Sequence, residues 1–150
     1  MKAPDTFYIA TCFHHDWQAR QIATLLEGCG WACTHRWWTE ETWKTESSWR
    51  ANALRDTRGV EAADIVLLLA TEGRQGCGMW FKWGYAMGLR KPVVLWAPPE
   101  HADLVTPSRS EATVPFVYLP TVQTVSCTWE ELIEGDPPQI HSLMLPWLRQ

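Results

Sequence analysis

The chain has 150 residues and a formal net charge of −4 at pH 7; 46% of its residues are hydrophobic and 20% are charged. These values are typical of one globular domain with its own core, and they exclude a disordered tail or a basic stripe for a nucleic-acid backbone. No apolar run is long enough to span a bilayer, and the N-terminus lacks the pattern of a signal peptide. We therefore expect a single cytoplasmic domain over residues 1–150 that contacts neither membranes nor nucleic-acid backbone.

The first third of the chain predicts two strands joined by a helix. Residues 7–12 form a short apolar run rich in β-formers, and residues 31–38 form a second strand candidate. Between them, residues 17–26 carry apolar side chains at helical spacing. Asp16 is placed to cap this helix, and two glycines follow its end.

The middle of the chain predicts a second helix and a buried strand. The helix is expected over residues 49–63, weakened by Gly59, with Asp56 facing solvent. Residues 64–70 are the clearest element, because an uninterrupted apolar run is typical of a strand buried on both faces of a parallel sheet. A glycine-rich loop over 71–78 follows it.

The second half of the chain continues the alternation of helices and strands. Thr128, with Glu131 three residues later, has the capping-box pattern of a short helix, and prolines break the remainder. The elements expected before it are a helix over 79–89, a strand over 91–96, a polar surface segment over 97–114 and a fifth strand over 114–119.

This alternation predicts an α/β fold with right-handed crossovers. We expect a flavodoxin-like three-layer sandwich with about five parallel strands in the order 2-1-3-4-5. Ligands of such sheets bind outside the carboxyl ends of the strands. The loops expected at that edge are 11–15, 36–39, 71–78 and 97–99.

Nothing in the sequence indicates a metal site or a cofactor. The five cysteines are an odd number in a chain large enough to fold without disulfides, so we expect reduced thiols. Cys29, Cys33 and His35 lack a second Cys/His pair at zinc-finger spacing. The glycines of residues 73–78 match neither a P-loop nor a dinucleotide fingerprint. The eleven tryptophans are more than one core of this size holds, which indicates a stacking pocket or an oligomer interface.

Four segments together resemble the nucleoside 2-deoxyribosyltransferase-like family, over roughly the first two-thirds of the chain. Residues 7–13 are similar to the family's opening strand and loop, and residues 30–37 to its second strand with a polar-aromatic tip. Asp56, followed eight residues later by Asp64 and an apolar strand, resembles a further family signature. The most specific segment is 78–94, which is similar to the family's Gly-Thr-x-x-Glu-x-Gly-x-Ala…Lys-Pro-Val.

The resemblance implies a site built around a nucleophilic Glu, and the chain departs from the family at that residue. The family's Glu attacks the anomeric carbon of the sugar, and Lys82 occupies its position here. Met79 replaces the family's Thr, whereas Asp56, which the family uses to hold the sugar, is present. Three interpretations follow: the pocket is kept without catalysis, Glu72 supplies the carboxylate, or Lys82 holds a phosphate.

The first functional hypothesis is an N-glycosidic transferase or hydrolase that acts on a small nucleoside or nucleotide, with Asp56, Glu72 and Lys82 as catalytic candidates. The second is a catalytically silent domain that binds a nucleotide or a nucleotide-derived signal. The third is an interaction domain, favoured by a second resemblance, to Toll/interleukin-1 receptor (TIR) domains. The family resemblance also implies a homo-oligomer, at least a dimer. The expected substrate-binding residues are Cys12, Phe13, Trp37, Gly78, Met79 and Trp80.

Overall fold

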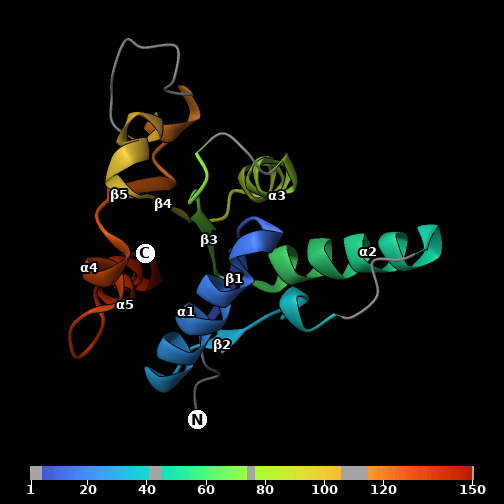
Figure 1. Ribbon diagram of the computed structural model, residues 1–150, viewed down its shortest axis with the longest axis horizontal. Helices are drawn as coiled ribbons and strands as arrows, with labels where there is room; N and C mark the ends of the chain where they lie inside the picture. Colours follow the sequence, from blue (N-terminus) through green and yellow to red (C-terminus); the bar gives the residue numbers. More distant parts are fainter. Residues whose placement is uncertain (1–4, 41–44, 74–76, 106–114, 150) are drawn as a thin grey trace.

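The computed structural model describes residues 5–40, 45–73, 77–105 and 115–149, with the backbone alone at 77, 115 and 149. Within these ranges a five-stranded parallel sheet has the order β2-β1-β3-β4-β5, and helices cover both of its faces (Figure 1). The predicted α/β class, flavodoxin-like layers and strand order are confirmed. The strands are β1 (Thr6–Ala10), β2 (Ala32–Cys33), β3 (Ile65–Leu69), β4 (Val93–Ala97) and β5 (Val122–Ser126).

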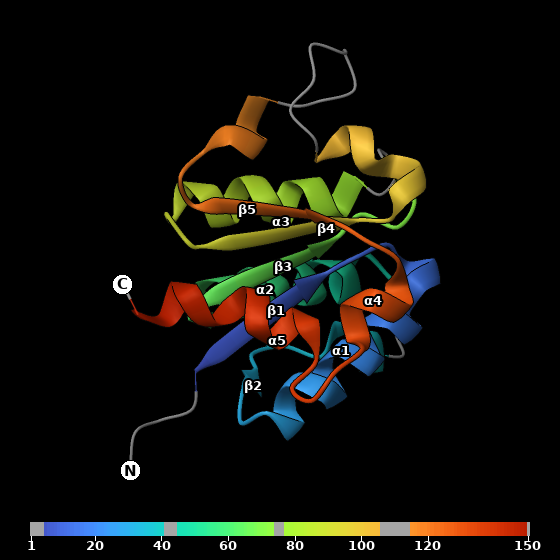
Figure 2. The same cartoon turned by 90° about the vertical axis from the view of Figure 1, so that its left-hand side faces the viewer.

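The helices divide between the two faces of the sheet (Figures 1 and 2). One face is covered by α2 (Glu46–Ala62) and α3 (Cys77–Gly88), which contact each other. The other is covered by α1 (Asp16–Gly28) with α4 (Trp129–Ile133) and α5 (Gln139–Met144). None of the helices in the described ranges has the length and apolarity to cross a membrane. Short 3-10 helices complete the chain: η1 (Phe13–His15), η2 (Trp37–Thr39), η3 (Pro99–Leu104), η4 (Pro115–Tyr118) and η5 (Leu145–Arg149).

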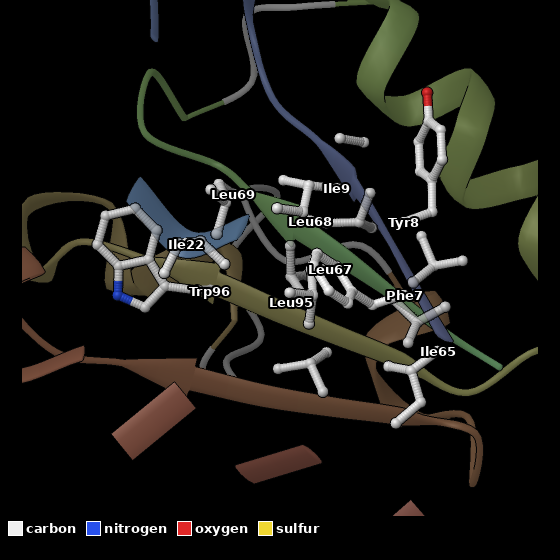
Figure 3. Packing of buried hydrophobic residues seen from close by; sticks show 14 of the residues in the cluster. Phe7, Tyr8, Ile9, Ile22, Ile65, Leu67, Leu68, Leu69, Leu95 and Trp96 are labelled. Carbon is white, nitrogen blue, oxygen red and sulfur yellow. The ribbon is translucent and has the colours of Figure 1, made fainter. Parts of the chain in front are cut away.

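The core is built on the central strands β3 and β4. Every side chain of both strands is buried, as expected where helices cover both faces of a parallel sheet. The two strands pair in register, with Val66 opposite Val93. Ile9, Leu67 and Leu95 lie at the centre of the apolar cluster (Figure 3), and burial of each such side chain contributes about 1.5–3 kcal/mol. The sheet is therefore a rigid base for the side chains at its edges and faces.

The second and fifth strands differ from the prediction. β2 is a short pairing of two residues, because the chain turns into η2 at Trp37. The fifth strand lies at 122–126 and not at 114–119; residues 115–118 form η4, where Phe116 and Tyr118 are exposed, and residue 114 lies outside the described residues. The prediction followed the apolar residues, whereas β5 lies at the edge of the sheet, where half-buried side chains allow a mixture of polar and apolar residues.

Two helix starts also differ from the prediction. Asp16 is the first residue of α1 and not its cap, and its carboxylate accepts a 3.2 Å hydrogen bond from Arg20 one turn later. α2 begins before the expected residue, where Thr45 forms a capping box. The capping box predicted at Thr128 and Glu131 is confirmed.

Gly59 marks the close approach of α2 to β1. The sequence predicted that this glycine weakens the helix, and the structure shows why it is needed. A Cβ built there would lie 2.7 Å from Cβ of His35 and 2.9 Å from ring carbons of Tyr8. Neither neighbour is the end of a flexible side chain, so any larger residue at this position pushes the helix away from the sheet.

Replacing Gly59 with alanine should destabilise the protein by about 1–3 kcal/mol, because this overpacking outweighs the higher helix propensity of alanine. Gly88→Ala is the matched control, since a Cβ at Gly88 meets nothing within 4 Å. That variant should be neutral or more stable by up to about 1 kcal/mol. Urea unfolding measures both changes, and equal unfolding free energies for the two variants would contradict the close approach.

Candidate functional site

An ion pair joins α2 and α3 on one face of the sheet. Nζ of Lys82 on α3 lies 3.0 Å from Oδ2 of Asp56 on α2. Oδ1 of Asp56 accepts a 2.7 Å hydrogen bond from the hydroxyl of Tyr8 on β1. The structure thus brings together two residues that the sequence singled out, Asp56 and Lys82, and adds Tyr8, which sequence reasoning had missed.

The expectation that Asp56 faces solvent is wrong. Its exposed fraction is 9%, because it shares the buried face of α2 with Gly59 and Val60. Burial, and then the charge of Asp56, raise the pKa of Tyr8 far above its usual range. The phenol therefore keeps its proton and acts as a donor. The carboxylate lies between a hydroxyl donor and an ammonium group whose charge balances its own.

Aromatic rings flank the ammonium group of Lys82. Its Nζ is 5.6 Å from the ring centroid of Tyr8 and 5.4 Å from that of Trp37, within the range of a cation–π contact. The indole N–H of Trp37 donates a 2.8 Å hydrogen bond to the carbonyl of Ile9. Phe13, which is 56% exposed, packs at a right angle against Trp37 with centroids 5.5 Å apart. Phe13 and Trp37 therefore form an aromatic wall that adjoins Lys82.

Three more polar side chains extend the cluster. Nε2 of His35 lies 3.5 Å from Oδ1 of Asp56 and 3.1 Å from Oε1 of Glu40. Nε of Arg55 donates a 2.7 Å hydrogen bond to the same oxygen of Glu40. The His35 ring stacks on Tyr8 at 6.5 Å. Burial lowers the pKa of His35, although the charges of Asp56 and Glu40 act in the opposite direction.

Only one of these additions had a signal in the sequence. Tyr8 lies within an otherwise apolar strand, and a tyrosine buried there needs a partner for its hydroxyl. His35 and Glu40 lie in irregular backbone around η2, where no periodicity fixes the direction of a side chain. Arg55 precedes Asp56 on α2 and is indistinguishable in sequence from a solvated surface arginine.

A small cavity of about 90 Å³ opens between α2 and α3 beside the ion pair. Its volume is below the range of roughly 300–1,000 Å³ that is usual for ligand pockets. The ion pair can therefore contact only part of a ligand from this side. The lining residues are Asp56, Thr57, Val60, Phe81, Lys82 and Tyr85.

Glu72 occupies a different place from the ion pair. It follows β3, and its Oε1 lies 2.9 Å from Nε2 of His15, which follows β1. The contacts in the described part of the chain include none between Glu72 and Asp56 or Lys82. Glu72 is thus at the carboxyl ends of the strands, as the sequence predicted, but pairs with a histidine.

The other predicted substrate-binding residues are distributed along the same edge and on α3. Cys12 and Met79 are buried, and Gly78 is exposed in the first turn of α3. Trp80 packs against Trp83 with centroids 5.4 Å apart. Both line an apolar cavity of about 320 Å³ with Gly84, Met87 and Phe116.

The described residues contain no group of three His, Cys, Asp or Glu side chains that could hold a metal ion. Cys33 lies near His35, but its thiol donates to the backbone carbonyl of that residue. Burial raises the pKa of Cys33 to about 11, so the thiol is protonated at neutral pH and is a poor metal ligand. Residues 74–76 of the glycine-rich loop lie outside the described residues.

The fold has counterparts among solved structures. The CMP N-glycosidase BcmB of Clostridium botulinum has a TM-score of 0.54 and 11% sequence identity, covering 81% of this chain and 88% of that one. A 2-deoxyribosyltransferase from Leishmania mexicana has a TM-score of 0.48 and 22% identity, covering 63% of this chain and 65% of that one. No protein-family model and no curated protein sequence matches the chain. The likeness to BcmB shows that the chain has the nucleoside 2-deoxyribosyltransferase-like fold that the resemblance implied.

Asp56→Asn and Lys82→Met should each destabilise the protein by about 1–3 kcal/mol, because each leaves the other half of a largely buried pair without its counter-charge. The double variant should be more stable than the sum of the single effects predicts, with a coupling of about 0.5–3 kcal/mol. The control is the exposed pair Glu46–Arg50 on α2, whose coupling should stay below about 0.5 kcal/mol. Urea unfolding of both cycles measures this, and equal couplings would contradict a buried ion pair.

Stability should depend on pH through His35. The pKa of His35 is lowered in the folded state, whereas in the unfolded chain it has the usual histidine value of about 6.5. Below about pH 6.5 the unfolded chain therefore takes up a proton that the folded chain does not. The stabilising contribution is complete above that pH and is lost as the pH falls toward the folded-state pKa. His35→Gln should therefore lose less unfolding free energy than the native chain between about pH 7.5 and 5.5. Identical pH slopes in urea unfolding of the two proteins would contradict this assignment.

Proposed function

We propose that this chain binds a nucleoside or nucleotide and does not cleave its glycosidic bond. The observation that carries this proposal is the 3.0 Å contact between Lys82 and Asp56, at the positions where the resemblance implies a nucleophile and a sugar-holding carboxylate. The lysine is not a solvent-exposed substitution at the rim of the site. It occupies the site and is neutralised by the residue beside it.

The chemistry of glycosidic cleavage argues against catalysis at Lys82. A nucleophile must offer a lone pair to the anomeric carbon, and the transition state carries positive charge on the sugar. A protonated ammonium group has no lone pair to offer, and its charge opposes that of the transition state.

The same cluster retains groups suited to binding. A carboxylate oxygen accepts more than one hydrogen bond, so Asp56 can still accept one from a sugar hydroxyl. The exposed ring of Phe13, packed on Trp37, offers a face for a base, and stacking on such a ring contributes about 1–3 kcal/mol. Because the chain shares its fold with a protein named as a CMP N-glycosidase, cytidine nucleotides are the first ligands to test.

A second candidate function is an N-glycosidic enzyme in which Glu72 provides the carboxylate. The contact between Glu72 and His15 favours it, because a carboxylate paired with an imidazole is a common acid–base arrangement. Against it, Glu72 makes no described contact with the Asp56 cluster that would hold the sugar. Base release by the native chain would decide for this alternative.

Oligomeric state is a separate proposal. The resemblance implies at least a dimer, and Phe81, which lines the cavity beside the ion pair, is 84% exposed. A second copy over this surface would remove a large apolar side chain from water. Light scattering after size-exclusion chromatography tests it, and a monomer at micromolar concentration would contradict it.

Calorimetric titration with CMP, dCMP, cytidine and deoxycytidine should detect binding to the native chain. Phe13→Leu should weaken it roughly tenfold, because the exposed stacking face is lost. Trp49→Leu, at an exposed tryptophan of α2, is the matched control and should bind as the native chain does. Absence of binding for all four compounds would contradict the proposal.

A carboxylate restored at position 82 tests whether the chain has lost only the nucleophile or has also lost the substrate pocket. Lys82→Glu should release free base from one of these compounds, whereas the native chain and Lys82→Met should not. Lys82→Met is the control because it removes the charge without adding a carboxylate. Chromatography of the free base measures the reaction, and base release by the native chain would overturn the proposal of silent binding.

A further inference from the structure

The contact between His15 and Glu72 lies where the strand order of the sheet reverses. β1 and β3 are parallel neighbours, with Phe7 opposite Ile65 in the register. β2, which follows β1 in the chain, lies on the side of β1 away from β3, and β4, which follows β3, lies on the side of β3 away from β1. The connections that leave β1 and β3 therefore run in opposite directions along the sheet. His15 ends the turn after β1, and Glu72 lies in the turn after β3. The 2.9 Å contact therefore joins the two turns across the crevice where ligands of such sheets bind.

The turn that carries His15 is short and lies at the surface. η1 is a single 3-10 turn of three residues, and none of them is buried. Its backbone closes with a hydrogen bond from His15 N to the carbonyl of Cys12. In the described part of the chain, His15 contacts Glu72, and Phe13 packs against Trp37. Phe13 and His15 are the two ends of this three-residue turn, so a contact that fixes His15 also restrains the backbone at Phe13.

We propose that His15 and Glu72 are positioning residues that hold η1, so that Phe13 keeps its contact with Trp37 in the aromatic wall beside Lys82. The consequence for ligand binding rests on the proposed function, but the coupling of Glu72 to Phe13 does not. The contacts form a continuous path from Glu72 through His15 and Phe13 to Trp37. Loss of the contact between Glu72 and His15 should therefore weaken the packing of Phe13 on Trp37.

The geometry of His15 favours positioning over acid–base catalysis. Its Nε2 is engaged by Glu72, and its Nδ1 is buried and has no hydrogen-bond partner in the described structure. Neither ring nitrogen is thus free to exchange a proton with a ligand. The side chains of the pair are 22% and 28% exposed, so water competes for the contact only in part.

The position of Phe13 can be measured directly by ¹⁹F NMR of protein labelled with 4-fluorophenylalanine. The chain has four phenylalanines, and loss of one signal in Phe13→Leu assigns the resonance. His15→Ala and Glu72→Ala should each move this resonance toward the value of an exposed ring, and the double variant should move it no further. Glu72→Gln keeps an acceptor for the imidazole N–H and should restore the native position. Asp16→Asn, which removes a neighbouring carboxylate bound to Arg20, is the control and should leave it unchanged.

An unchanged Phe13 resonance in both alanine variants, or additive shifts in the double variant, would overturn the proposal. Nucleotide titration of the same proteins tests the consequence for the site. Glu72→Ala should weaken binding roughly fivefold, with Glu72→Gln close to native. If the native chain binds no nucleotide while the resonance shifts as expected, the proposed function fails and the positioning role stands.

Discussion

The close approach of α2 to β1 at Gly59 is the constraint on which the site depends. A helix can bring a short carboxylate to a neighbouring strand only where its backbone lies almost against that strand. Asp56 lies three residues before Gly59 and so on nearly the same side of the helix, and it reaches the hydroxyl of Tyr8. The ring of Tyr8 and Cβ of His35 occupy the space that a side chain at Gly59 would fill. One missing Cβ thus sets the positions of three polar side chains.

The ion pair of Lys82 and Asp56 is the electrostatic consequence of that packing. An aspartate buried against a strand needs a donor or a counter-charge, because an unpaired buried carboxylate is strongly unfavourable. Tyr8 supplies a hydrogen bond, but burial keeps that phenol neutral, so it cannot supply charge. Lys82 does so from α3. The lysine is therefore part of the packing of α2 on α3.

Periodicity alone was sufficient to predict most of the fold but little of the site. The buried run that became β3 and the capping box at Thr128 are local signals, and the structure confirms them. The fifth strand was misplaced because an edge strand tolerates polar residues, so the apolar residues of η4 gave the stronger pattern. Asp56 and Lys82 were identified only through a family resemblance. That they touch depends on the contact between two helices, which no spacing within either helix encodes.

The charges around the site bear on which part of a nucleotide it could recognise. Among the described residues of the cluster, four charged side chains make two pairs: Lys82 with Asp56, and Arg55 with Glu40. His35 between them adds no charge at neutral pH, because burial lowers its pKa. A phosphate bound to either of these two described cations would have to displace the carboxylate that is its partner. A sugar hydroxyl and a stacked base need no such exchange: the first can donate to Asp56, and the second can pack on Phe13. Under the proposed function, this balance of charge favours a role for Lys82 in holding Asp56 in place for a sugar over a role in holding a phosphate.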